Sequence, residues 1–171
     1  SSSAASDVYK RQLFENVISH LAIIVSFQSL ILGMSGNVGT QSLAVTIRVL
    51  MDEDLSGRQK WELIFKEARI GFCNGLMLGL LAFAFIGTYV YVLKGRPLQY
   101  AFSVSACAGV ALMLAMTISS VVGTVVPMFF HKVKVDPAVA SGPLISTVND
   151  FVAVVTYYGL AWVLLIHVLH L

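Results

Sequence analysis

Hydrophobic side chains are gathered into four long stretches, and short polar segments separate them. The stretches cover residues 14–33, 68–93, 102–129 and 144–169. A helix needs about 20 mostly apolar residues to cross about 30 Å of hydrocarbon, so each stretch is long enough for one crossing. The pattern therefore predicts an all-α integral membrane protein with four transmembrane helices.

Composition excludes a water-soluble domain. Hydrophobic residues make up 57% of the 171 residues and charged residues only 12%, against about 45–50% and about 25% in soluble domains. We infer a single membrane domain over residues 13–171. Residues 1–12 are polar, and we interpret them as a disordered tail or a cloning remnant. The net charge of +2 is too small to indicate a nucleic-acid partner.

The segment 35–50, directly after the first stretch, is the least regular part of the pattern. If it continued the first helix, the whole unit would be about 55 Å long, too long for one crossing. Gly33, Gly36 and Gly39, with Asn37 among them, predict a break or bend here. Inside a membrane, a broken helix is tolerated only where it faces protein or a water-filled cavity. The predicted break therefore indicates a pore. Asn37 is a candidate cation contact in that pore, and packing at the helix break is its alternative role.

Residues 51–66 form the most charged segment and must lie in water. We expect a short loop followed by a short amphipathic helix, because Trp61, Leu63, Ile64 and Phe65 are interspersed with charges. The segments after the first and third stretches carry seven Lys and Arg residues, and the other side carries four. The positive-inside rule therefore places 51–66 in the cytoplasm of a multi-pass protein of the cell (inner) membrane.

Small residues recur at every fourth position in two stretches. The two series are Gly71, Gly75 and Gly79, and Ala111, Ala115, Ser119 and Gly123. Such ridges let helices approach closely in lipid. They indicate packing within one subunit, with a seam between two subunits as the alternative.

Asp150 is the most informative ionisable residue, because it lies one to two turns into the fourth stretch, about 9 Å from Leu144. A charge at the centre of a span costs about 2.5–3.5 kcal/mol, so it normally faces a cavity or a partner and marks a pathway. Ser146, Asn149 and Asp150 are spaced i, i+3 and i+4, so we expect them on one helical face. The alternatives are a structural salt bridge and a protonated, hydrogen-bonded carboxyl group.

The oxygen atoms of this face favour a hard divalent cation. Carboxylate, amide and hydroxyl oxygens suit Mg²⁺, Ca²⁺ or Mn²⁺, and no thiolate or imidazole lies beside them in sequence. Mg²⁺ takes only one or two direct carboxylates, so two Asp150 side chains across a two-fold axis would balance its charge. Asp136, which precedes Pro137, is interpreted as a helix cap or as an ion contact on the cytoplasmic side.

Two segments resemble the membrane domain of the MgtE-type magnesium channels, relatives of an animal solute-carrier family. The core of FENVISHLAIIVSFQSLILGMSGNVGTQSLAVTIRVL is similar to the family's pattern Gly-Gly-Asn-x-Gly-Asn-Gln followed by an apolar run and Arg. DPAVASGPLISTVNDFVAVVTYYGLA is similar to the family's Asp-Pro-Ala…Ser-x-Pro…Thr-x-x-Asp helix. Ser35 and Thr40 depart from the first pattern, where the family has Gly and Asn.

The resemblance implies a homodimer with the ion path at the subunit interface, lined by the two helices that carry these motifs. It implies that Asp150 forms the central Mg²⁺ site and that Asn37, Gly36 and the backbone near Ser146 line the pore. Asp136 falls on an acidic position at the cytoplasmic mouth. The ion would pass largely hydrated, and the same oxygen ligands would accept Mn²⁺ or Co²⁺. Relative to the family, a first membrane helix and the cytoplasmic sensor domains are missing.

The sequence thus favours a channel-like Mg²⁺ pathway and leaves two rivals. One is a carrier that exchanges the divalent ion for Na⁺ or H⁺. The other is a non-transporting membrane subunit or assembly factor, in which Asp150 pairs helices. We expect no enzyme, because the sequence contains no nucleophile–base set, P-loop or dinucleotide-binding fingerprint.

Overall fold

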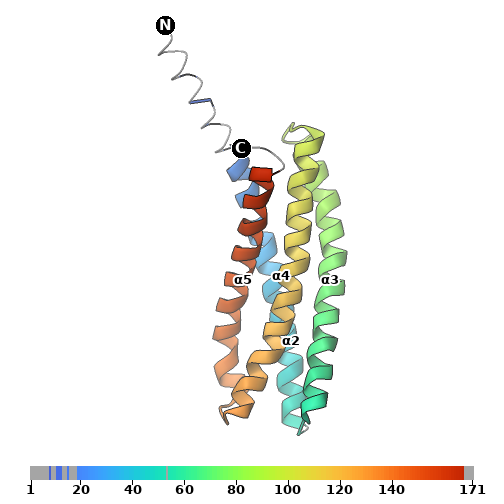
Figure 1. The fold of residues 1–171 in the computed structure, drawn as a ribbon, viewed down its shortest axis with the longest axis vertical. Coiled ribbons are helices and arrows are strands. Elements are labelled where there is room, and N and C mark those ends of the chain that lie inside the picture. The colour runs from blue at the N-terminus through green and yellow to red at the C-terminus, as the bar shows by residue number, and fades with distance from the viewer. Residues whose placement is uncertain (1–7, 9–10, 13–14, 16–18, 53, 168–171) are drawn as a thin grey trace.

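The computed structural model describes residues 8, 11, 12, 15, 19–52 and 54–167, and these include an elongated bundle of four long helices (Figure 1). The helices are α2 (Gln28–Asp52), α3 (Gly57–Val92), α4 (Leu98–Lys132) and α5 (Pro137–His167). Most of the expected tail (1–7, 9–10), the first residues of the first stretch (13–14, 16–18) and the end of the fourth (168–169) lie outside the described residues.

Four helices are long and apolar enough to cross a membrane, as the hydrophobic pattern predicted. These candidate spans are Ser19–Asp52, Gly57–Val92, Leu98–Lys132 and Gly142–Leu164. The first three contain 34, 36 and 35 residues, which corresponds to about 51–54 Å at 1.5 Å per residue. A bilayer with its headgroups is about 40–45 Å thick. These helices are therefore longer than the predicted stretches and tilt or extend into water.

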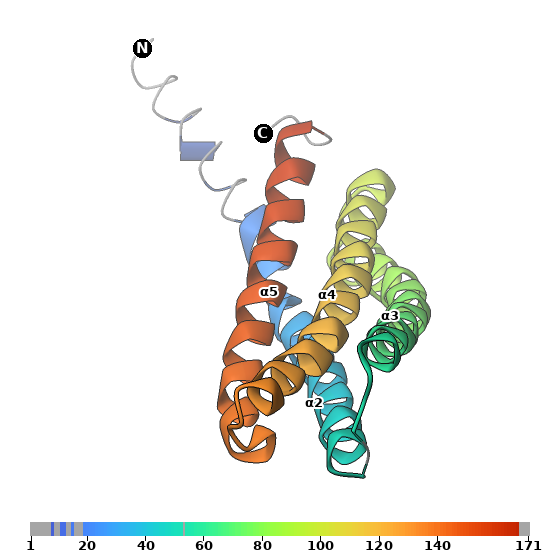
Figure 2. The same ribbon diagram turned by 60° about the horizontal axis from the view of Figure 1, so that its bottom comes forward.

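Helix α4 is the centre of the bundle. It packs against α3, α2 and α5, whereas α3 touches α2 at only a few positions (Figure 2). The α2–α3 and α4–α5 connections lie at one end of the bundle, and the α3–α4 turn lies at the other (Figure 1). Consequently α2 and α5 run antiparallel, side by side.

The predicted break at the glycines of the first span is wrong. Helix α2 runs without interruption through Gly33, Gly36 and Gly39. The interruption lies earlier, at Phe27, a single turn residue whose N–H donates to the carbonyl of Ile24 at 3.2 Å.

One of these glycines, Gly39, serves close packing instead of a break. A Cβ atom on Gly39 would collide with the side-chain amide of Asn149 on α5, and one on Gly123 of α4 would collide with the carbonyl oxygen of Gly39. Helices α2, α4 and α5 can therefore meet at this point only because these side chains are missing. Glycine costs a helix roughly 1 kcal/mol relative to alanine, which tertiary packing readily offsets.

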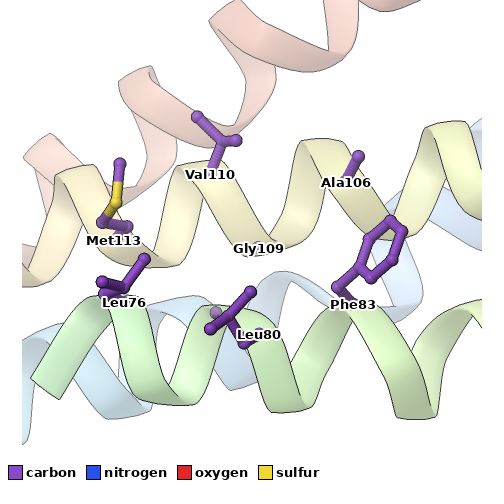
Figure 3. Close-up of a pocket in the computed structure, with 8 residues that line it drawn as sticks. Leu76, Leu80, Phe83, Ala106, Gly109, Val110 and Met113 are labelled. Carbon is purple, nitrogen blue, oxygen red and sulfur yellow. The ribbon is translucent and has the colours of Figure 1, made fainter.

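The two ridges of small residues pack within one subunit, so the alternative of a seam between subunits is wrong. Both series are buried inside this single chain. The α3 series crosses α4 at Gly79 and Gly109, where a Cβ on either residue would lie 2.7 Å from the carbonyl oxygen of the other. An apolar pocket of about 170 Å³ lies beside this crossing, with Leu80 and Phe83 among its walls (Figure 3). All of its lining side chains are apolar, so this pocket offers no ligand to an ion.

Residues 51–66 do not form a separate amphipathic helix. Helix α2 ends at Asp52, and Ser56 caps the next helix, α3. The Ser56 hydroxyl accepts a hydrogen bond from the N–H of Gln59 at 3.4 Å, and Oε1 of Gln59 accepts one from the N–H of Ser56 at 2.8 Å. The helix that follows this capping box contains no proline. The charged residues after Ser56 therefore form the first turns of α3.

Candidate functional site on the α2–α5 seam

One hydrogen bond defines the register of α2 against α5. The hydroxyl of Tyr158 on α5 donates to Oε1 of Gln28 on α2. Steps of four residues follow the ridges of packed helices. Along α5 such steps lead from Tyr158 to Val154, Asp150 and Ser146, and along α2 from Gln28 to Leu32, Gly36 and Thr40. Counted from this bond, Asp150 falls level with Gly36, and counted from the contact between Gly39 and Asn149 it falls level with Val38, about 3 Å away along the axis. Asp150 therefore lies within one helical turn of Gly36 along the axis.

Asp150 lies near the middle of the fourth span and on the surface of the chain. It follows Gly142, the start of the span, by eight positions, or about 12 Å. Its side chain is exposed, and within the described part of the chain no ion pair or hydrogen bond involves it. The salt bridge considered from the sequence is therefore not formed among these residues.

Asn149 does not share the exposed face of Ser146 and Asp150. Its side chain is 0% exposed, and among the described residues neither Oδ1 nor Nδ2 has a hydrogen-bond partner. The buried stripe of α5 advances in steps of four from Ile145 through Asn149 to Ala153. Ser146 and Asp150 each follow a member of that stripe by one position, which places them at its rim.

The predicted residues of α2 lie on its accessible side. Asn37 is exposed and Gly36 is partly exposed. Thr40, which the sequence marked only as a departure from the family pattern, is also exposed, and its hydroxyl donates to the carbonyl oxygen of Gly36 at 2.9 Å. Ser146 on α5 donates in the same way to the carbonyl of Gly142 at 3.3 Å. Each hydroxyl oxygen keeps lone pairs for another partner.

Asp136 acts as the cap of α5. Its Oδ1 accepts a hydrogen bond from the N–H of Ala138 at 2.9 Å, and α5 begins at Pro137. The capping interpretation is therefore confirmed. Asp136 is exposed at the α4–α5 connection, far along the chain from Asp150, so its predicted ion contact stays a prediction.

Glu67 is a buried acid that the sequence analysis missed. Its side chain is 4% exposed, and Oε2 accepts a hydrogen bond from the Ser42 hydroxyl of α2 at 2.9 Å. Its backbone carbonyl accepts another from Ser120 of α4 at 2.9 Å. Glu67 precedes Gly71 by four positions on the buried ridge of α3, so extending that ridge by one turn would have identified it.

These residues do not form a closed metal cage within one chain. Among the described residues, no group of three or more His, Cys, Asp or Glu side chains could hold a metal ion. The chain instead presents one free carboxylate with neighbouring hydroxyl and amide oxygens on the surface of a membrane span. This arrangement defines a class of protein: a helical membrane protein that carries a carboxylate and neighbouring polar side chains on the surface of its α2 and α5 helices, at the depth of the bilayer.

Comparison with known proteins identifies the family. The family model MgtE, described as a divalent cation transporter, matches residues 28–160, well over half of the chain. The chain therefore belongs to the MgtE family.

Three curated relatives carry the name "Magnesium transporter MgtE". Those of Bacillus subtilis (strain 168) and Enterococcus faecalis are each 36% identical over 148 residues, covering 86% of this chain and 31% of theirs. The relative from Thermus thermophilus is 32% identical over 155 residues, covering 90% of this chain and 32% of its own. The chain thus spans about a third of the length of these relatives.

Proposed function

We propose that this chain is the membrane domain of a magnesium transporter, and that Mg²⁺ crosses the bilayer along the exposed α2–α5 seam. The observation that carries the proposal is the carboxylate of Asp150, which has no partner among the described residues and lies within one turn of Gly36 along the axis and one turn after Ser146 on α5. Membership in a family described as divalent cation transporters supports the choice of ion. Carboxylate, hydroxyl and amide oxygens are the ligands that Mg²⁺ prefers.

The exposed position of Asp150 favours an assembly of two copies. A carboxylate that faced lipid at this depth would cost about 2.5–3.5 kcal/mol, so a partner or water must cover it. A second copy related by a two-fold axis would do so and would supply a second Asp150, giving two negative charges to one divalent ion. One carboxylate per chain is too few to hold a dehydrated ion, so Mg²⁺ passes largely with its waters.

The remaining seam residues have supporting roles in this proposal. Asn37 and Thr40 offer amide and hydroxyl oxygens to the waters of the ion, and the Gly36 backbone lines the path. Asp136 attracts cations near the α4–α5 connection. Buried Asn149 faces away from the path, so its role is to hold α5 against Gly39 and thereby to orient Asp150. The end that carries the α2–α3 loop faces the cytoplasm, by the excess of Lys and Arg there.

The test is Mg²⁺ uptake into liposomes that carry the purified 171-residue chain, under an inside-negative potential. We expect uptake by the wild type and at least a tenfold reduction in the Asp150→Asn variant, because the amide keeps the shape and removes the charge. Asp54→Asn is the matched control, since Asp54 is exposed in the α2–α3 loop, outside the spans. It should retain wild-type uptake.

The same assay separates the rival functions. Uptake that requires an opposing Na⁺ or H⁺ gradient would replace the channel with a coupled carrier. Equal uptake by wild type and Asp150→Asn would refute the pathway through Asp150. If neither transports and Asp150→Asn only weakens association of the copies, the chain is an assembly subunit.

A further inference from the structure

The first turns of α3 present a face that no other described helix covers. The side chains along it, from Arg58 to Phe72, all belong to α3. Trp61 and Phe65 are 64% and 71% exposed on it, with ring centroids 6.4 Å apart. Large aromatic side chains this exposed, grouped with cations, indicate a binding surface.

Two cations on this face have no carboxylate partner in the described part of the chain. Glu62 precedes Lys66 by four positions, the favourable spacing for an ion pair. Glu62 instead pairs with Arg58, with Nε and Oε1 2.9 Å apart. Lys66 and Arg69, three positions apart on the same face, are exposed and unpaired.

The depth of this face matches the lipid headgroups. From Ile70 to Val92 the helix contains no charged residue, a length of about 35 Å that fills the hydrocarbon core. Lys66 and Arg69 lie directly outside this stretch, within about 5 Å of each other along the axis. Phe72, 44% exposed, lies one turn further in, at the start of the acyl chains.

We propose that this face binds an anionic phospholipid, with the phosphate between Lys66 and Arg69 and an acyl chain along Phe72. The planar donors of arginine and the point charge of lysine both suit phosphate oxygens. Trp61 and Phe65 are side chains that favour the membrane–water boundary. The site requires only that α3 spans the membrane, so it does not depend on the proposed ion transport.

The test measures lipid selectivity with a single indole at the site. Trp61→Phe and Trp162→Phe remove both tryptophans of the chain, and Phe72→Trp introduces the reporter. The protein is reconstituted in phosphatidylcholine vesicles that contain brominated phosphatidylglycerol or brominated phosphatidylcholine at equal fraction. We expect quenching to favour phosphatidylglycerol by roughly fivefold per cation. The additional pair Lys66→Gln and Arg69→Gln should bring the selectivity close to one.

Two further variants locate the effect. Lys132→Gln with Lys134→Gln removes two cations at the same end of the bundle but off α3, and should keep the selectivity. Lys66→Arg with Arg69→Lys preserves both charges and should also keep the selectivity, which controls for folding.

Unchanged selectivity after Lys66→Gln and Arg69→Gln would overturn the site. Equal loss in the Lys132 and Lys134 variant would assign the attraction to the whole surface. Absence of quenching by either lipid would mean that protein, such as a second copy, covers this face.

Discussion

At the scale of single residues, the contact between Asn149 and Gly39 couples the two helices of the seam. A buried amide without a hydrogen bond costs roughly 1–3 kcal/mol. Asn149 nevertheless lies at the point where α5 meets α2, and it fits because Gly39 has no side chain. The direction of the next residue, Asp150, depends on this fit.

Gly39→Ala should therefore destabilise the bundle by about 1–3 kcal/mol, as overpacking does in other cores. The new methyl group collides with the Asn149 amide, which is fully buried. Gly33→Ala is the matched control on the same helix, because nothing lies within 4 Å of its Cβ position. That variant should be neutral or slightly stabilising. Thermal unfolding in detergent, followed by circular dichroism, measures both.

A double variant shows whether the cost of Gly39→Ala arises from this contact. Asn149→Ala in the Gly39→Ala background removes the colliding amide, so part of the lost stability should return. If the two losses simply add, the Gly39–Asn149 contact is not the source.

The sequence could identify Asp150 but not the direction of its neighbour. A carboxylate in an apolar stretch is visible in any sequence, and so are the oxygen-bearing residues around it. Asn149 and Asp150, at positions i+3 and i+4 from Ser146, nevertheless point to different sides of α5. Which of Asn149 and Asp150 turns inward depends on where α2 and α4 pack, which the spacing within one helix does not contain.

At the scale of the helices, the start of α3 is determined by the residue that precedes it, Ser56. The capping box at Ser56 satisfies N–H groups that would otherwise have no partner. It allows α3 to begin in the charged segment and to carry Lys66 and Arg69 in helical register up to the membrane.

Ser56→Ala should cost about 1 kcal/mol and fray the first turn of α3. Ser56→Asp retains a side-chain acceptor at the cap and should keep most of the stability. Hydrogen exchange of the amides of residues 57–60 measures the effect directly. Equal protection in the Ala and Asp variants would contradict the role of the cap.

Two element-level predictions were wrong for related reasons. A helix break was predicted at the glycines, because glycine lowers helix propensity. Propensity did not decide the outcome, because α4 and α5 pack against Gly39 and the helix continues through Gly33 and Gly36 as well. A separate amphipathic helix was predicted because charges dominate residues 51–66, but charge does not end a helix. The Ser-x-x-Gln sequence from Ser56 to Gln59 already contained the signal for the true beginning.

At the scale of the whole molecule, one chain leaves its most polar membrane surface uncovered. Asp150, Asn37 and Thr40 are exposed on neighbouring helices at bilayer depth. The number of the spans could be predicted from hydrophobicity alone, but three of the helices are longer than the predicted stretches. The partner that covers this surface could not be predicted, because an interface between copies leaves no periodic signal in one sequence.

Cross-linking tests the proposed interface between copies. In a background of Cys73→Ser and Cys107→Ala, Asn37→Cys should give a covalent dimer with a bismaleimide in liposomes. Leu80→Cys is the control, because Leu80 is 62% exposed but lies on α3, away from the seam. It should stay monomeric at the same protein concentration. A dimer from Leu80→Cys alone would move the interface to α3.

The unbroken course of α2 makes it a lever. From Asn37 to Asp52 the helix continues for 15 residues, about 22 Å, without interruption. A force applied at the loop end is therefore transmitted to Asn37 as a rigid rotation instead of being absorbed by local unwinding. Helix α2 would pivot where Gly39 crosses Gly123 of α4, and its continuous helical segment begins after the turn at Phe27. Tilting the loop end in one direction swings the Gln28 end in the other, so the α2–α3 loop is mechanically linked to the interior of the span through this helix.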